Sequence, residues 1–216
     1  DAGSQAYSLE AADLNANGRP ELYVSAMNSN GNPSGICIEF NGGRYRTTIS
    51  KIPWHLRRVT LPGEGTVLLA QEYDPRGREF AGPVFRVKRS GERLTAGATL
   101  ALPKRVNLYG FAPFTNQGRT LIAWVDDDGY LTVSNTSGEP LAVSADSVGG
   151  TESSFEMNDE TANGLESRRI YLKGRVEITS RGNILVNANS GISILGRLRM
   201  YTRSELKLFS LNGTNL

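Results

Sequence analysis

A run of oxygen-bearing residues near the start of the chain has the spacing of a cation-binding loop. Asp13, Asn15 and Asn17 occupy alternate positions, Gly18 follows, and Glu21 lies eight residues after Asp13. A hard cation such as calcium takes about six to eight oxygen ligands at short range. The pattern therefore makes Asp13, Asn15, Asn17 and Glu21, with the backbone carbonyl of Arg19, the candidate Ca2+ ligands. Because Asn, Asp and Gly are also turn residues, the same loop can fold without a metal.

No other stretch selects a reaction centre. The only histidine, His55, is interpreted as structural, because triads and histidine metal sites need further partners. The only cysteine, Cys37, alternates with Ile36 and Ile38 and is interpreted as a strand thiol. Asp126–Asp128 precede Gly129 and are predicted to form a hairpin turn. The sequence contains no nucleophile-elbow, zinc-protease or phosphate-loop motif. We therefore predict a protein that is not an enzyme.

The elements that would carry these residues are short strands separated by glycine turns. A glycine is followed by an apolar strand at Gly18, Gly65, Gly118 and Gly182. These junctions recur at intervals close to the ~40–50 residues of a propeller blade. We divide the chain into four repeat units, at about 7–50, 51–102, 103–150 and 165–216. The polar segment 151–164 is predicted to be a long surface loop. The sequence thus favours an all-β fold with short antiparallel sheets: one domain over 1–216 that is a β-propeller or a four-blade portion of one.

Composition agrees with such a domain and excludes some partners. The chain has 216 residues, with 24 glycines and 9 prolines, which suits a backbone that reverses direction often. Its 24 basic and 22 acidic residues nearly balance, so we expect neither nucleic acid nor an anionic membrane as a partner. The longest apolar runs, such as Val67–Ala70, are far too short to span a bilayer. No signal-peptide pattern follows Asp1, which fits a trimmed protein and a fragment equally well.

The loop Asp13-Leu-Asn-Ala-Asn-Gly-Arg-Pro-Glu-Leu resembles the FG-GAP/VCBS repeat family, the calcium-loop β-propeller repeat also found in integrin α-chain heads. Segments such as Pro53-Trp-His-Leu-Arg-Arg-Val and Gly149-Gly-Thr-Glu-Ser-Ser-Phe look more narrowly like bacterial exported VCBS-repeat proteins. Positions 15 and 17 hold Asn where the family usually has Asp, which implies weaker calcium binding. The equivalent loops before Gly65, Gly118 and Gly182 have lost their acids and are expected to be plain turns. Family propellers usually have about seven blades, whereas this chain shows four units.

The resemblance implies a non-enzymatic binding or adhesion scaffold, located outside the cytoplasm in the periplasm, on the outer membrane surface or secreted. Its expected partner is a protein or glycan at the cell surface, and its Ca2+ would be structural. Two alternatives stay open. One is an assembly subunit whose open blade edges pair with other chains, either by self-association or with the remainder of a larger propeller. The other is a carbohydrate-active enzyme with acids from Asp126–Asp128 or Glu152–Glu160, which would require two carboxyl groups within about 5–10 Å.

Overall fold

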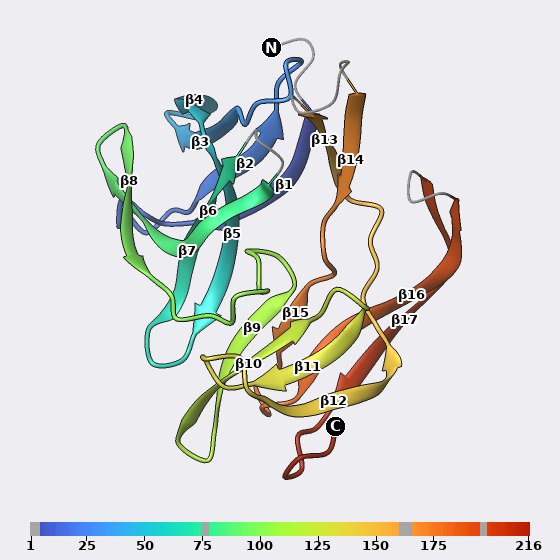
Figure 1. The fold of residues 1–216 in the computed structure, drawn as a ribbon. Coiled ribbons are helices and arrows are strands. Elements are labelled where there is room, and N and C mark those ends of the chain that lie inside the picture. The colour runs from blue at the N-terminus through green and yellow to red at the C-terminus, as the bar shows by residue number, and fades with distance from the viewer. Residues whose placement is uncertain (1–4, 75–77, 160–165, 195–197) are drawn as a thin grey trace. The chain divides into compact units, whose positions relative to one another are not determined.

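The structure, a computed structural model, describes residues 5–74, 78–159, 166–194 and 198–216. All regular elements of these residues are β-strands, β1 to β17 (Figure 1). No helix in the described part of the chain is long and apolar enough to cross a membrane. The chain forms two compact units: one of Asp1–Val59, Thr66–Leu100 and Ser154–Ile170, the other of Thr60–Gly65, Ala101–Ser153 and Tyr171–Leu216.

Two four-stranded antiparallel sheets follow each other in the first half of the chain. Their strands are β1 (Gln5–Ala12), β2 (Glu21–Met27), β3 (Gly35–Asn41) and β4 (Arg44–Ile52), then β5 (Trp54–Leu61), β6 (Gly65–Asp74), β7 (Arg78–Ser90) and β8 (Arg93–Thr99). In both sheets the spatial order equals the chain order. Each sheet is therefore a meander, the strand pattern of a propeller blade.

The second half of the chain forms a third four-stranded meander and two smaller sheets. The strands are β9 (Phe111–Asn116), β10 (Arg119–Val125), β11 (Tyr130–Ser134) and β12 (Pro140–Ser147), then the pair β13 (Ser154–Asp159) and β14 (Glu166–Tyr171), and finally β15 (Val176–Ile178), β16 (Ile184–Ile194) and β17 (Leu198–Phe209). The sheet β15–β16–β17 is a fourth meander, with three strands. Together with the three four-stranded sheets it gives the four blade-like sheets of a β-propeller. The predicted all-β propeller class is confirmed.

The four junction glycines occupy the same place in each meander. Each stands at the turn that leads from the first strand into the second, and each has a positive φ: Gly18 (+79°), Gly65 (+81°), Gly118 (+74°) and Gly182 (+79°). A residue with a Cβ atom reaches this left-handed region only at a cost, whereas glycine does not. The recurring glycines of the sequence are therefore the residues that close the first hairpin of each sheet.

Replacing Gly118 by alanine tests this role. A Cβ atom added at Gly118 would meet no other atom within 4 Å, so the cost arises in the backbone alone. We expect the free energy of unfolding to fall by about 1–2 kcal/mol, and Gly118→Asn to cost less because asparagine tolerates the left-handed region. Urea-induced unfolding measures both. Equal losses for the two variants would argue against the backbone explanation.

Each compact unit has its own apolar core. The core of the first comprises Ala12, Tyr23, Cys37, Ile52, Leu56, Leu68, Ala70, Phe85 and Val87. The core of the second comprises Ala112, Phe114, Leu121, Ala123, Val125, Leu131, Val133, Ala142, Val148, Val176, Ile184 and Val186. Most of these residues recur at every second position of a strand, because alternate side chains of a strand point to opposite faces.

The predicted surface loop over 151–164 is wrong for part of its length. Residues Ser154–Asp159 form β13, which pairs with β14, while 160–164 lie outside the described residues. Within β13, Phe155 and Met157 are fully buried. Glu156, which lies between them, is exposed and pairs with Arg169 at 2.9 Å. This alternation of buried and exposed residues is a strand pattern, although only two of the residues are apolar.

Candidate functional site

The candidate calcium loop connects β1 to β2 and is folded around its own side-chain oxygens. The carboxylate of Asp13 accepts hydrogen bonds from the backbone N–H groups of Asn17 (3.1 Å) and Gly18 (2.8 Å). The Asn15 side-chain oxygen accepts from Asn17 N–H (3.1 Å), and that of Asn17 accepts from Arg19 N–H (2.8 Å). These Asx-type bonds hold the oxygen-bearing side chains over a short, exposed segment.

Two residues of the loop adopt left-handed backbone conformations. Gly18 has a φ of +79°, and Ala16 has a φ of +57° although it carries a Cβ atom. Such a conformation costs an alanine on the order of 1–2 kcal/mol. The hydrogen bonds from the backbone N–H groups of Asn17 and Gly18 to the side chains of Asp13 and Asn15 span Ala16 and stabilise it.

Glu21 lies at the buried end of the loop, as the first residue of β2, and its side chain is 1% exposed. Its Oε2 atom accepts hydrogen bonds from Leu14 N–H (3.0 Å) and from the Tyr23 hydroxyl (3.0 Å). Its Oε1 atom is buried and has no hydrogen-bond partner. A buried carboxylate oxygen without a partner is costly, so within the described part of the chain this atom is an unfilled acceptor beside the loop.

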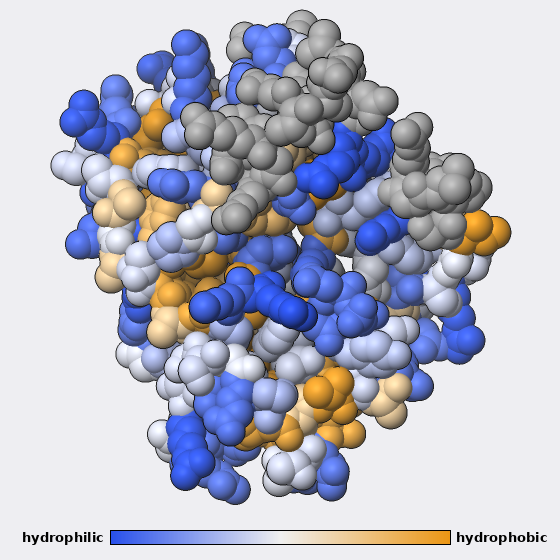
Figure 2. All heavy atoms as spheres, in the orientation of Figure 1, coloured by the Kyte–Doolittle hydropathy of each residue, from blue (hydrophilic) through white to orange (hydrophobic). Residues whose placement is uncertain are grey.

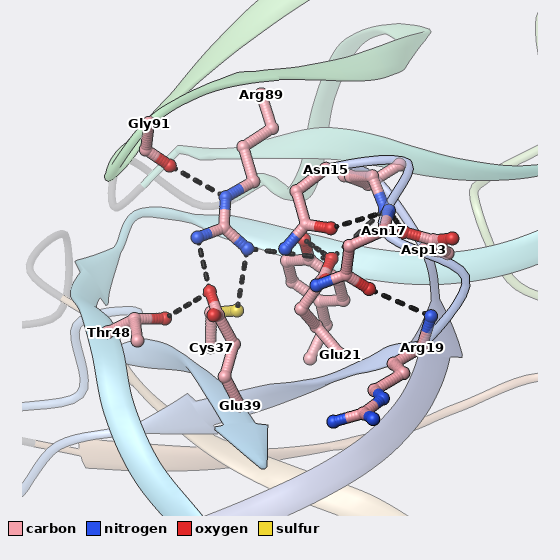
Figure 3. A network of polar contacts seen from close by, with 12 residues as sticks. Asp13, Asn15, Asn17, Arg19, Glu21, Cys37, Glu39, Thr48, Arg89 and Gly91 are labelled. Atoms are coloured by element: carbon pink, nitrogen blue, oxygen red, sulfur yellow. Dashed lines mark hydrogen bonds and ion pairs between the residues drawn. The ribbon is translucent and has the colours of Figure 1, made fainter. Parts of the chain in front are cut away.

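Arg89, near the end of β7, points its guanidinium towards Glu21, Cys37 and Glu39 of the sheet formed by β1–β4 (Figure 3). Its guanidinium pairs with Glu39 and lies 3.5 Å from Glu21 Oε2, with a side chain that is 6% exposed. It also donates to the Gly91 carbonyl (2.7 Å), and its Nη1 atom lies 3.9 Å from the sulfur of Cys37. One buried cation thus bridges two carboxylates from two strands, the arrangement for which Arg is better suited than Lys.

The environment shifts the pKa of several groups in this network. Arg89, by donating hydrogen bonds, lowers the pKa of the Glu39 carboxyl. Burial raises the pKa of Tyr23 and that of the Cys37 thiol. Burial lowers the pKa of Arg89, but its bonds to Glu39 and Tyr23 outweigh this, and the pKa is raised overall. At neutral pH the network therefore holds a protonated Arg89, an ionised Glu39, and neutral Tyr23 and Cys37.

The structure brings the five predicted metal-site residues together in one loop and strand start. Within the described chain, no group of three or more His, Cys, Asp or Glu residues is arranged to hold a metal ion. Any cation would therefore depend on the amide oxygens of Asn15 and Asn17 and the carbonyl of Arg19 as well as on Asp13 and Glu21. The unpartnered Oε1 of Glu21 fits such a cation, whereas Arg89 opposes it by placing a positive charge beside Oε2.

Other residues singled out from the sequence have structural partners. His55 is fully buried, with Nε2 donating to the Glu79 carbonyl (2.7 Å) and Nδ1 accepting from the Tyr7 hydroxyl (2.8 Å). Asp126 accepts from Asp128 N–H (3.0 Å) and Tyr130 N–H (2.8 Å), so the predicted hairpin turn at Asp126–Gly129 is confirmed.

Several of the acids proposed for a carbohydrate-active enzyme also have partners. Asp127 pairs with Lys173 (2.8 Å), Glu156 pairs with Arg169, and Glu152 accepts from Tyr201 N–H (3.3 Å). Glu160 lies outside the described residues. Three of these acids therefore have partners within the chain.

The sequence reasoning missed Arg89 and Glu39. Both lie in the same phase of a strand as buried neighbours: Arg89 follows Phe85 and Val87 at two-residue steps, and Glu39 follows Cys37. A charged residue at an inward position of an alternating strand was the available signal.

Comparisons with protein-family models, curated proteins and solved structures find no match.

Proposed function

We propose that this chain is a non-enzymatic binding or adhesion scaffold of the FG-GAP/VCBS-repeat type, working outside the cytoplasm, with a structural Ca2+ at the loop Asp13–Glu21. The observation that carries the proposal is the buried, unpartnered Oε1 atom of Glu21 beside a loop of alternating oxygen side chains. The blade-like sheets support it as well, because their connecting loops are free to vary and bind partners while the strands form a rigid support.

The loop can hold a cation without unfolding. Each carbonyl or carboxylate oxygen that accepts one N–H bond keeps a second lone pair, so Asp13, Asn15 and Asn17 can bind a cation while their turns persist. A bound Ca2+ would supply positive charge to Asp13 and Glu21 and fix the entry of β2. With only two carboxylates, and with Arg89 3.5 Å from one of them, we expect weak binding, with a Kd of about 0.1–1 mM, the range of extracellular modules.

Calcium is therefore expected to stabilise the protein measurably. At about 10 mM calcium, binding of this strength adds about 1.4–2.7 kcal/mol and raises the melting temperature by about 3–11 °C relative to chelator. Asp13→Asn removes one charge of the loop and should abolish most of the shift. The matched control Asp127→Asn, whose acid pairs with Lys173, should keep it. A melting temperature that calcium and chelator leave unchanged would remove the metal from the proposal.

The binding role needs a separate test. Beads coated with the folded chain are expected to adhere to a glycan array or an array of cell-surface proteins, and beads coated with the heat-denatured chain are not. Adherence to neither array would overturn the scaffold proposal. Release of reducing sugar from the glycans would overturn it in favour of the carbohydrate-active alternative.

A further inference from the structure

Among the described residues, the sheet β15–β16–β17 is the one meander with three strands, and no described strand pairs with the outer edge of β17. The other three meanders have four strands each. Strand β17 pairs with β16 from Leu198 to Phe209, and no described residue pairs with its other edge. Natural proteins rarely leave a long edge strand open, because its N–H and C=O groups pair readily with another strand.

Side chains already bind backbone N–H groups in the N-terminal part of this edge. Arg199 N–H donates to the Tyr171 hydroxyl (3.2 Å), and Tyr201 N–H donates to the Glu152 carboxylate (3.3 Å). A bulge interrupts the pairing between Tyr201 and Arg203. The free part of the edge is therefore the segment Arg203–Phe209.

The outward face of this free segment is apolar, which reverses the usual alternation. Leu206 is 75% exposed and Leu208 is 57% exposed, whereas Glu205, Lys207 and Phe209 between and beside them are half-buried. Leu208 lies directly opposite Leu185 of β16, on the same face. Figure 2 shows apolar residues at the molecular surface in the region where β12 and β17 lie in Figure 1. A solvated outer face would carry polar residues at these positions.

We propose that the free edge of β17 pairs with β17 of a second copy of this chain, antiparallel about a twofold axis at Leu206. Charge selects this register. A shift of the axis to Glu205 would place Glu205 opposite the same residue of the second copy, and a shift to Lys207 would do the same for Lys207. With the axis at Leu206, Glu205 of each copy lies opposite Lys207 of the other. Opposite charges across a strand pair stabilise it and like charges destabilise it.

The same register joins the apolar faces. Leu206 lies opposite Leu206 of the other copy at the axis. Leu208 of each copy is the next residue along the strand on the same face. Four leucines then form one strip across the joint sheet, and both edges gain hydrogen-bonded partners. Such a twofold interface is self-complementary, as a homodimer requires. Because the paired segment is short, we expect micromolar affinity.

Analytical ultracentrifugation of the intact chain over about 1–200 μM tests the inference. We expect the mass to rise with concentration from 23.5 kDa towards twice that value. Leu206→Lys should raise the Kd for self-association about tenfold or more. Leu9→Lys, at a residue of β1 that is 59% exposed, is the matched control and should leave the Kd unchanged. A mass of one chain at every concentration would overturn the inference and leave the edge to a different partner.

A charge swap distinguishes this register from general stickiness. Glu205→Lys and Lys207→Glu should each raise the Kd about tenfold, and the double variant should restore it to within about threefold. Within one chain, Glu205 pairs with Arg203 and Lys207 pairs with Asp146 (3.3 Å), and the double variant loses both contacts. Restored association can therefore arise only between chains. A double variant as weak as the singles would overturn the register. Neither result depends on the calcium loop.

Discussion

Replacing Arg89 by methionine is expected to lower the free energy of unfolding by about 3–5 kcal/mol. The loss follows from the buried partners that remain. Glu21 is 1% exposed and Glu39 is 19% exposed, and without Arg89 both carboxylates lose their cation. The measurement is urea-induced unfolding at pH 7 with chelator present, so that no metal ion replaces the missing charge.

The matched control is Arg168→Met. Arg168 pairs with Glu79 at 3.0 Å, but the two side chains are 48% and 34% exposed. Exposed ion pairs contribute little, so this variant should lose less than about 1 kcal/mol. An Arg89→Met variant that is no less stable than Arg168→Met would show that the buried pair is unimportant.

A second variant separates lost charge from lost packing. Glu21→Gln removes the charge that Arg89 faces but keeps an oxygen that can accept from Leu14 N–H and the Tyr23 hydroxyl. In the Arg89→Met background this change should recover part of the loss, because a neutral amide costs less to bury than an unpaired carboxylate. In the wild-type background it should destabilise. Opposite signs in the two backgrounds are the signature of a charge pair.

The sequence was sufficient for the features that depend on neighbouring residues. Gly18, Gly65, Gly118 and Gly182 marked the hairpins because a positive φ is a local requirement that glycine meets. The turn after Asp126 was predictable because its side chain bonds the backbone of Asp128 and Tyr130. The Asx bonds of the Asp13 loop are local in the same way.

The first strands of three sheets gave no clear signal, for identifiable reasons. In β1 the alternation is inverted, with Leu9 59% exposed and Glu10 4% exposed. Strand β5 buries His55 and Arg57 among its apolar residues. Strand β9 contains Pro113, which its place at the edge of the sheet tolerates. Tertiary packing in these strands overrides the pattern that a sequence displays.

The candidate site was predictable only in its local half. Residues 13–21 are close in sequence, and their types and spacing were enough to predict them as candidate cation ligands. Arg89 reaches Glu21 and Glu39 across 68 and 50 residues of chain, so only the pairing of β2 with β3 and the packing of β7 bring the three charges together. A single sequence contains no information on such a contact beyond the inward phase of each charged residue.

The second large effect is a loss of stability in acid that depends on His55. The imidazole lies among the rings of Tyr7, Phe80, Phe155 and Tyr73, with centroids 4.7–6.2 Å away, and its two nitrogens bond Tyr7 and the Glu79 carbonyl. Burial lowers the pKa of His55 from 6.5 to about 4. Among the described residues, the ring neighbours of His55 that carry an ionisable group are Tyr7 and Tyr73.

The sign follows from proton binding. Below pH 6.5 the unfolded chain protonates His55 while the folded chain keeps it neutral, so stability decreases as the pH falls towards about 4. A separation of this size corresponds to about 3 kcal/mol between pH 7 and pH 4. Above pH 6.5 both states hold a neutral imidazole, and this contribution is complete.

His55→Phe isolates this contribution, because phenylalanine fills the aromatic site and has no proton to gain. The readout for each protein is the change in its free energy of unfolding from pH 7 to pH 4, measured with urea at unit steps of pH. The absolute stability of the variant at pH 7 does not enter this comparison. We expect wild type to lose about 3 kcal/mol more than His55→Phe over this range, since the carboxylates contribute equally to both. Parallel pH profiles for wild type and His55→Phe would contradict this prediction, because they would mean that His55 has the same pKa in the folded and unfolded states. NMR of the single imidazole gives a direct check, because its folded-state titration midpoint should lie near pH 4, below the 6.5 of an exposed histidine.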